Sequence, residues 1–379
     1  MTAKKLLIPV SLLILISLHL YCSHTEIISV EVLKWKNGAQ AAYTIIHDDL
    51  CNPEISGIYR YADTIAYNRG IRFGAAAIAK LCYDKGEPMW DIMKRMVDHG
   101  HEIVSHSWAH GASVDLGWLA QNWSVELDVI KSKEVIEKYV PGAEVTFMVF
   151  PYDAYDEQRI EEIRAHGYLG ARAGIKKYTD DRGVNVNFEN FDPFRNCYFD
   201  AYVSRAEQQV IDASESPYTV SIYNNENDDI EIQHLDSALA SGGWSIQELH
   251  TVDDEEPWGW GRMSVERYRA LLDYAKSKVE SGVLWVGTPT EVIRYIVTRE
   301  RIGKPTIEGN VMSFLIPEDF DARYACEVTV KINTSGKVSQ IIGDQSGLEI
   351  ETTRVERNSF LMNVNPVNGD VVLYFEDQE

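Results

Sequence analysis

The chain has 379 residues and contains 36 Lys and Arg against 58 Asp and Glu, which gives a formal net charge of −22. This charge argues against nucleic acid and anionic membrane surfaces as partners, because both are bound through basic patches. The hydrophobic content of 45% and the aromatic content of 11% are sufficient for a sizeable core and exclude a mainly disordered chain.

The first residues are typical of a secretory signal peptide. A short basic start precedes an apolar run over residues 6–20, which at about 15 residues is shorter than the roughly 20 that span a membrane. The sequence Leu-Tyr-Cys-Ser at its end resembles a bacterial lipoprotein signal, in which Cys22 is lipidated. We therefore expect residues 1–21 to be removed, Cys22 to provide the membrane attachment, and the mature chain to lie outside the cytoplasm, secreted or in the cell envelope. The alternative is plain secretion with cleavage near Ser23 or His24.

Cysteine usage leaves the redox state open. Five cysteines occupy positions 22, 51, 82, 197 and 326, and no C-x-x-C pair is present. A Cys-based zinc site or a dithiol redox motif is therefore not expected. With Cys22 assigned to lipid, the remaining four are either free thiols or form one or two disulfides.

From about residue 27 to residue 297, strand-like apolar runs alternate with amphipathic helical stretches. The expected strands cover residues 41–46, 101–104, 145–150, 168–173 and 283–286. The expected helices cover residues 87–99, 118–139, 156–166, 264–279 and 290–297. This alternation indicates βα units around a parallel sheet or barrel.

Past about Ile302 the pattern changes to β-rich runs separated by turn pairs. These pairs are Ser335-Gly336, Ser346-Gly347 and Asn368-Gly369. We therefore expect an α/β domain over residues 22–303 and a small all-β accessory domain over residues 304–379.

An acidic doublet follows the first expected strand of the α/β region. Neighbouring strand residues point to opposite faces, so Asp48 and Asp49 can share one site only where the strand ends. Two adjacent carboxylates resist ionising together unless a cation lies between them or hydrogen bonds separate their roles.

A pair of histidines, His106 and His110, is spaced four residues apart. On a helical turn both imidazoles would project from one face, as two ligands of one metal ion must. The pair alone is weak evidence, because chance often produces this spacing. Together with one Asp it gives three ligands, the number in a hydrolytic zinc site that keeps a fourth position for water.

The segment Gly100-His-Glu-Ile-Val-Ser-His-Ser-Trp-Ala-His110, which follows an amphipathic helix, resembles the polysaccharide deacetylase family. This family comprises metal-dependent carbohydrate esterases, including chitin, chitooligosaccharide, peptidoglycan and acetylxylan deacetylases. The resemblance covers roughly residues 41–297. Pro151-Tyr152 falls where the family has Arg-x-Pro-Tyr, and Leu249-His250 falls at its late Leu-x-His.

The resemblance implies a partly open, distorted (β/α)7 barrel with the site at the carboxyl ends of the strands. It implies that one divalent metal ion, Zn2+ with Co2+ or Ni2+ as substitutes, is bound by three ligands: Asp49, His106 and His110. Asp48 would be the general base, His250 the general acid, and the backbone N–H of Tyr152 would stabilise the oxyanion. The implied reaction is hydrolysis of N- or O-acetyl groups from a polysaccharide or oligosaccharide.

The chain also departs from the family pattern. Met-Val-Phe precedes Pro151, so the Arg that orients the base in the family is missing. No Asp-x-x-Asp-Trp segment is present, and Asp192 is the substitute we expect to tune His250. His47 stands where the family usually has Phe. A second hypothesis is therefore a catalytically impaired carbohydrate-binding lipoprotein of the same fold.

One carboxylate with two histidines is also the iron(II) oxygenase triad, but those enzymes use a β-jelly-roll, whereas this chain predicts βα units. We expect His101 to be structural. His99, His166 and His234 have no acidic or His partner at ligand spacing, so we expect surface or core roles for them.

Overall fold

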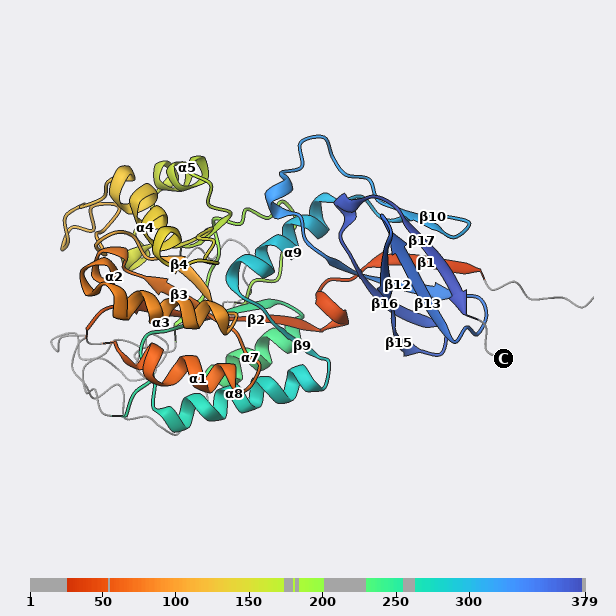
Figure 1. The fold of residues 1–379 in the computed structure, drawn as a ribbon, viewed down its shortest axis with the longest axis horizontal. Helices are drawn as coiled ribbons and strands as arrows, with labels where there is room; N and C mark the ends of the chain where they lie inside the picture. Colours follow the sequence, from red (N-terminus) through yellow and green to blue (C-terminus); the bar gives the residue numbers. More distant parts are fainter. Residues whose placement is uncertain are drawn as a thin grey trace, which may run out of the picture.

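The computed structural model of the chain describes residues 26–53, 55–173, 180, 184–200, 230–254 and 263–376. They form an α/β part and, beside it, a β part made of antiparallel sheets (Figure 1). The expected signal segment 1–21 and Cys22 lie outside the described residues. Within these ranges, no helix combines the length and the apolar character that crossing a membrane requires.

The α/β part is built on a parallel sheet with the strand order β6-β5-β4-β3-β2-β8-β7, and β9 also pairs with β2. The strands are β2 (Ala41–Leu50), β3 (Gly74–Ala77), β4 (Glu102–Ser105), β5 (Phe147–Val149), β6 (Gly170–Arg172), β7 (Phe199–Asp200), β8 (Trp244–Leu249) and β9 (Leu284–Val286). The described order ends at β6 and β7, which confirms the expected partly open barrel. This described sheet has eight strands rather than the expected seven, and one of them, β7, has only two residues.

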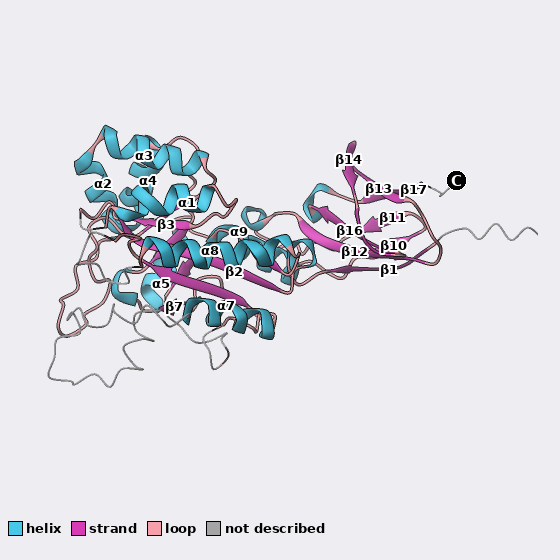
Figure 2. Ribbon diagram, turned by 90° about the horizontal axis from the view of Figure 1, so that it is seen from below, coloured by secondary structure: helices cyan, strands magenta, loops and turns pink. Residues whose placement is uncertain are grey.

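Helices surround the parallel sheet, as Figure 2 shows. They are α1 (Asp63–Tyr67), α2 (Ala79–Lys85), α3 (Glu87–Asp98), α4 (Ser132–Tyr139), α5 (Glu157–Ala165), α7 (Ile230–Ser241), α8 (Val265–Glu280) and α9 (Pro289–Arg301). The prediction of a helix over residues 118–139 is wrong for its first part, because the helical segment begins only at Val125. Ser124 caps a π-helical turn, Val125–Lys131, by accepting the N–H of Leu127, and α4 follows it.

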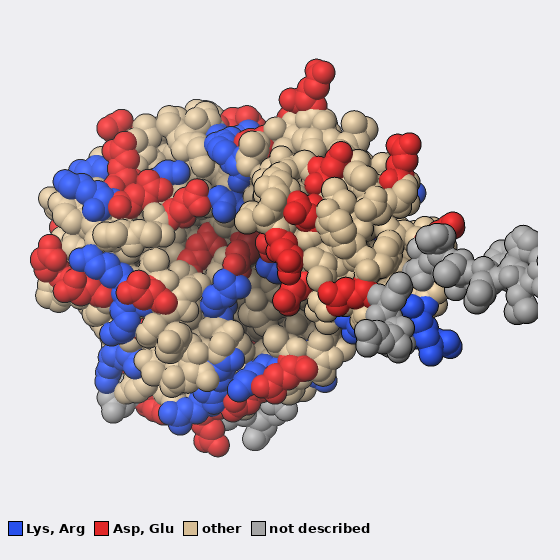
Figure 3. Space-filling model, turned by 45° about the vertical axis from the view of Figure 1, so that its right-hand side comes forward, with Lys and Arg blue, Asp and Glu red and all other residues tan. Residues whose placement is uncertain are grey.

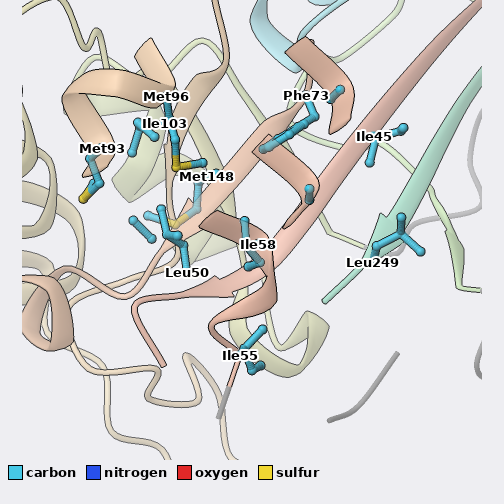
Figure 4. Packing of buried hydrophobic residues seen from close by; sticks show 14 of the residues in the cluster. Ile45, Leu50, Ile55, Ile58, Phe73, Met93, Met96, Ile103, Met148 and Leu249 are labelled. Atoms are coloured by element: carbon cyan, nitrogen blue, oxygen red, sulfur yellow. The ribbon is translucent and has the colours of Figure 1, made fainter. Parts of the chain in front are cut away.

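Outward-facing residues of the strands pack against the surrounding helices (Figure 4). Ile45 of β2, Ile103 of β4 and Met148 of β5 share one buried cluster with Met93 and Met96 of α3. These helices therefore fix the outer face of the barrel.

Inward-facing residues alternate with the outward ones and form a second core. Ile46 of β2, Val104 of β4, Val149 of β5 and Ile246 of β8 pack in one cluster with Ile293 of α9. Because strand side chains alternate with a period of two, the residues two positions later on these strands also face the barrel interior, at the carboxyl ends. The candidate site lies there.

The β part contains two antiparallel sheets with the orders β1-β12-β16-β15 and β10-β11-β17-β13-β14. Their strands are β1 (Ile27–Val32), β10 (Thr306–Glu308), β11 (Val311–Ser313), β12 (Val328–Thr334), β13 (Gln340–Gln345), β14 (Leu348–Glu351), β15 (Thr353–Glu356), β16 (Ser359–Val364) and β17 (Val371–Glu376). Strand β1 pairs with β12, so it belongs to the β part and not to the domain 22–303 in which we expected it. Local patterns do not encode this pairing, which joins strands about 300 residues apart in the sequence.

One disulfide joins Cys51, just after the acidic doublet, to Cys82 of α2. Cys197 and Cys326 are not disulfide-bonded. On the face shown in Figure 3, acidic and basic side chains are interspersed over both parts of the molecule.

Candidate active site

A β-bulge turns both members of the acidic doublet into one site. His47 and Leu50 of β2 pair with Ala75 and Ala77 of β3, so β2 contains one extra residue over this stretch. Asp49 has a left-handed backbone, with φ of 63°. The bulge explains how consecutive residues, which would otherwise face opposite sides of the sheet, can serve neighbouring positions.

The side chains of Asp49, His106 and His110 converge. Asp49 Oδ1 lies 3.3 Å from His106 Nε2 and 3.2 Å from His110 Nε2, and the two imidazole nitrogens are 3.1 Å apart. Asp49 Oδ1 is buried and accepts no hydrogen bond from the described residues. Burial would raise the pKa of Asp49, but the adjacent imidazoles, His106 first, hold that pKa well below its usual range.

The two imidazoles differ in protonation. His106 Nδ1 lies 2.8 Å from the carbonyl oxygen of Val149, which can only accept, so Nδ1–H donates and Nε2 faces Asp49. Burial acts to lower the pKa of His106, but the Asp49 and Asp48 carboxylates outweigh it and raise that pKa, so a metal ion would have to displace the proton on Nε2. Burial, together with the charge of His106, lowers the pKa of His110 to about 4, so that ring is neutral near pH 7. A tetrahedral zinc ion with bonds of about 2.0–2.1 Å requires ligand atoms about 3.3–3.4 Å apart. The observed spacing fits such an ion.

The expected helical arrangement of the histidine pair is wrong. His106 directly follows strand β4, and residues 107–109 form a turn that brings His110 back beside it. Ser107 and His110 both have left-handed φ values, and the Ser107 hydroxyl accepts the backbone N–H of His110 at 2.9 Å. The four-residue spacing therefore works through a tight turn rather than through helical periodicity.

Asp48 is held by an arginine that no sequence motif indicates. Arg172 of β6 donates from Nη1 to Asp48 Oδ1 at 2.9 Å and from Nη2 to Asp48 Oδ2. Both side chains are nearly fully buried. Burial would raise the pKa of Asp48, but the charge of Arg172, followed by those of His106 and His250, keeps it lowered. Asp48 is therefore an ionised carboxylate in a fixed orientation.

His250 is paired with Glu248, which lies two positions earlier at the inward-facing end of β8. Burial acts to lower the pKa of His250, but the adjacent Glu248 carboxylate outweighs it and raises that pKa to about 9. Nitrogen and oxygen atoms of Asp48, Glu248 and His250 lie within 4.8 Å of one another. His250 is therefore a protonated imidazolium beside the ionised Asp48 at neutral pH.

His47 supports the same strand end from the outer face. Its Nδ1 lies 2.9 Å from the His250 carbonyl oxygen and its Nε2 lies 3.0 Å from the Tyr268 hydroxyl. Burial lowers the pKa of His47 to about 4, so the ring is neutral. Because a carbonyl can only accept, Nδ1–H donates to His250 and Nε2 accepts from Tyr268. The polar residue that replaces the family's usual Phe thus fixes the backbone of His250.

Tyr152 lies at the edge of the ligand group. Its ring centroid is 4.6 Å from that of His110. Tyr152 and Asp153 both have left-handed backbones, with φ of 59° and 51°, in a short 3-10 turn that follows β5. Consecutive non-glycine residues in this region are costly, and such strain concentrates at functional sites.

Two expectations about the surroundings of the site are wrong. Asp192 forms ion pairs with Arg164 and Arg195, whereas the carboxylate that contacts His250 belongs to Glu248. The second error concerns His99, which does have an acidic partner: its Nδ1 lies 2.6 Å from Asp63 Oδ1.

His101 completes the group around Asp63. Its Nε2 lies 3.3 Å from Asp63 Oδ1, and Arg95 donates to Asp63 Oδ2 at 2.9 Å. His101 Nδ1 accepts the backbone N–H of Phe73, so Nε2 of the neutral ring bears the proton and has no lone pair for a metal ion. Although the three side chains of Asp63, His99 and His101 have metal-ligand spacing, this group is a buried ion-pair cluster. The structural role expected for His101 agrees with it.

Residues 62–171 match the polysaccharide deacetylase family model. This range includes His106, His110 and Tyr152. Among curated proteins, a chitin deacetylase of Arthroderma benhamiae is 31% identical over 107 residues. The matched stretch covers 27% of this chain and 27% of that protein, so the chain spans about a quarter of the length of this relative.

The chain is also similar to solved structures, at lower sequence identity. The peptidoglycan deacetylase PdaC from Bacillus subtilis is 12% identical, with a TM-score of 0.38 over 67% of this chain and 90% of that chain. A family 4 carbohydrate esterase from Streptomyces lividans in complex with acetate is 10% identical, with a TM-score of 0.37 over 66% and 93%. These TM-scores are too low to support an argument. The family model match confirms the family resemblance found in the sequence.

Proposed function

Since residues 62–171 match the polysaccharide deacetylase family model, we propose that the chain hydrolyses acetyl groups of an acetylated polysaccharide or oligosaccharide. The observation that carries this proposal is the convergence of Asp49, His106 and His110 next to Asp48 and His250. The ligand group, a base and an acid are the parts that metal-assisted acyl hydrolysis requires.

A divalent metal ion held by Asp49, His106 and His110 would polarise the acetyl carbonyl and lower the pKa of water. We propose Zn2+ as the native ion, because one carboxylate and two imidazoles are ligands that zinc prefers. The ionised Asp49 and the neutral His110 meet the requirement that ligands be deprotonated before binding.

Asp48 would act as the general base. Its carboxylate is ionised, and both of its oxygens are held by Arg172, so it is oriented before a substrate arrives. The carboxylate would accept the proton of the attacking water. The N–H of Tyr152 would donate a hydrogen bond to the oxygen that gains negative charge as the carbonyl carbon becomes tetrahedral.

His250 would act as the general acid. Glu248 keeps its imidazolium protonated at neutral pH, so it can give a proton to the departing amine of an N-acetyl group or alkoxide of an O-acetyl group. Both kinds of acetyl group fit this chemistry, and both belong in the test.

We also propose that the protein works outside the cytoplasm, either secreted or held by lipid at Cys22. The N-terminal sequence supports this location. The disulfide between Cys51 and Cys82 supports it as well, because structural disulfides are rare in reducing compartments.

The hypothesis of an inactive carbohydrate-binding protein depended on the missing Arg before Pro151. A guanidinium does contact Asp48, from Arg172 on another strand, so that reason no longer applies. The iron oxygenase reading is disfavoured because the described sheet around the site is parallel and not a jelly roll.

The test is acetate release from acetylated chitooligosaccharides, acetylated xylan and small acetate esters. We expect release by the metal-loaded protein, loss with a chelator and recovery on adding Zn2+ or Co2+. Activity that survives both the chelator and His106→Ala would refute the proposal. Metal analysis of the purified protein separates zinc from iron.

A further inference from the structure

The inner face of β5 has no cation at the level of Asp48. In the family's Arg-x-Pro-Tyr pattern, the position of the arginine corresponds to Val149 of this chain. Val149 is fully buried and packs with Phe147 and the helix α9 residue Ile293 in the inner core. An apolar residue at this position leaves the orientation of Asp48 to another part of the barrel.

The neighbouring strand supplies the guanidinium. Arg172 of β6 is the direct register partner of Val149, so it lies at the same level of the barrel, one strand further from β2. From there its side chain crosses the interior to Asp48, which is 124 residues away in sequence. Only an arginine has a planar fork that can donate to both carboxylate oxygens at once.

The surroundings of Arg172 hold it in place. Its Cζ lies 4.4 Å from the ring centroid of Tyr198, which places the guanidinium on an aromatic face. Tyr198 in turn hydrogen-bonds Asp153 through its hydroxyl. Gly170, two residues before Arg172 on the same strand face, leaves room that a Cβ would not, because such an atom would approach Ile293 Cδ1 to 2.3 Å.

We propose that Arg172 is the positioning residue for the base Asp48. In this chain β6 thus provides the guanidinium that orients Asp48, because the apolar Val149 of β5 cannot. The inference rests on the proposed function. It predicts that the orientation of Asp48, rather than metal binding or substrate affinity, depends on the guanidinium of Arg172.

The test uses Arg172→Ala in the full-length, metal-loaded protein. We expect kcat to fall by about 100-fold, as misplacement of a catalytic group does, while KM stays within about threefold. Metal content stays unchanged. Millimolar methylguanidinium should restore part of kcat in Arg172→Ala but none in Arg172→Ala/Asp48→Asn. Arg172→Lys should have a lower kcat than Arg172→Ala in the presence of methylguanidinium, because Lys donates at a single point.

A matched control is Arg267→Gln, which breaks another largely buried ion pair, with Glu231. It should lower thermal stability without a kcat loss that methylguanidinium restores. An unchanged kcat in folded Arg172→Ala, or lost metal content, would overturn the inference. Absence of acetate release by the unmodified protein would instead refute the proposed function itself.

A separate observation concerns two aromatic residues beside the ligand group. Trp118 is 68% exposed, and its ring centroid lies 5.6 Å from that of Tyr152, at an interplanar angle of 88°. Tyr152 is itself 45% exposed, and its ring contacts the His110 ring. The indole therefore lies within about 10 Å of a proposed metal ligand while most of its surface remains in water.

The loop before α4 is built to present Trp118. Gly117 has a left-handed backbone with φ of 79°, and its N–H donates to Asp115 Oδ1 at 2.7 Å. The backbone N–H of Leu116 donates to the carbonyl of Leu119 at 3.1 Å. These bonds order the turn around an exposed indole, which would otherwise be an unfavourable surface residue.

We infer that Trp118, with Tyr152 beside it, forms a binding subsite for the apolar face of a sugar ring next to the acetylated unit. This inference also rests on the proposed function and names its substrate as a chain of at least two sugars. Stacking on Trp118 should strengthen the binding of a substrate long enough to reach the indole and should not affect a small acetate ester.

The test compares an acetylated chitooligosaccharide with a small acetate ester in Trp118→Ala. We expect KM for the oligosaccharide to rise about 10-fold, with kcat and the kinetics on the small ester unchanged. Trp118→Phe should recover part of the loss. Tyr374→Ala, which removes an exposed aromatic side chain of the β part, is the matched control and should change neither substrate. Equal effects on both substrates, or no effect on either, would overturn the inference; activity on neither substrate in the unmodified protein would refute the proposed function.

Discussion

Glu248 Oε1 lies 2.8 Å from His250 Nδ1, and the two residues are separated by one position at the end of β8. Both side chains face the barrel interior because strand residues alternate. The pair sets the charge of the proposed acid, since burial alone would lower the pKa of His250 and Glu248 raises it to about 9.

Glu248→Gln should move the alkaline limit of activity. A general acid must be protonated, so kcat/KM falls as pH rises through the pKa of His250. Removing the Glu248 charge lowers that pKa, and the alkaline limb should shift to lower pH by at least about one unit. The measurement is a profile of kcat/KM against pH. Glu291→Gln, which affects a partly exposed ion pair with Arg72, is the control and should leave the limb in place. An unmoved limb in Glu248→Gln would contradict the assignment of His250.

His106→Gln should weaken metal binding by more than about 100-fold. Removing even an indirect partner of a metal ligand costs 10–100-fold, and a direct ligand costs more. Calorimetric titration with Zn2+ measures the affinity, and the visible spectrum of the Co2+ form reports the coordination. His166→Gln is the control, because the His166 ring contacts the Glu162 carbonyl on an exposed helix end. Equal affinity of the two variants would place the metal site elsewhere.

The double substitution Cys51→Ser/Cys82→Ser should lower the free energy of unfolding by about 3–4 kcal/mol. The disulfide closes a segment with a sequence separation of 31, and loop-closure entropy in the unfolded chain gives this magnitude. Urea unfolding of both proteins measures the difference. Cys326→Ser removes a thiol that is not disulfide-bonded and should cost less than about 1 kcal/mol. A double variant as stable as the parent would show that the bond does not restrict the unfolded chain.

Asp63→Asn should destabilise the fold by about 3 kcal/mol, because it removes the buried carboxylate that pairs with Arg95, His99 and His101. Burial acts to raise the pKa of Asp63, but its partners, His101 first, lower it from 3.8 to about 2. The stabilisation is thus present above pH 3.8 and is lost as pH falls toward 2.

Unfolding curves recorded between pH 2 and pH 6 test this expectation, and the Asp63→Asn protein should lack the steep acid dependence of the parent. Asp273→Asn, which breaks an exposed pair with Arg69, should cost less than about 1 kcal/mol. Similar losses for the two variants would mean that burial of Asp63 adds nothing.

The sequence predicts the α/β order well because hydrophobic periodicity is local. Helices α3, α5 and α8 begin and end within about two residues of the expected ranges, and Asp156 and Ser264 cap α5 and α8. The convergence of Asp49, His106 and His110 was likewise implied by a motif. The roles proposed for these residues remain predictions.

What the sequence did not predict depends on distant contacts. Arg172 meets Asp48 only because β6 and β2 face each other across the barrel, and no short motif contains both. The pairing of Asp63 with His99 spans 36 residues. Glu248 is different: its position two residues before His250 on an expected strand was a usable signal, because such residues share one face.

The first described strand, β1, lies in the sheet of the β part, and a short turn, Lys36–Gly38, connects toward β2. β2 (Ala41–Leu50) then runs about 23 Å from Ala41 before it reaches the acidic doublet. If Cys22 carries a lipid, the membrane attachment would therefore lie at the end of the molecule opposite the proposed active site. The β part would then separate the proposed active site from the bilayer, and the proposed activity would suit polymers that lie some distance above the bilayer instead of glycolipids embedded in it.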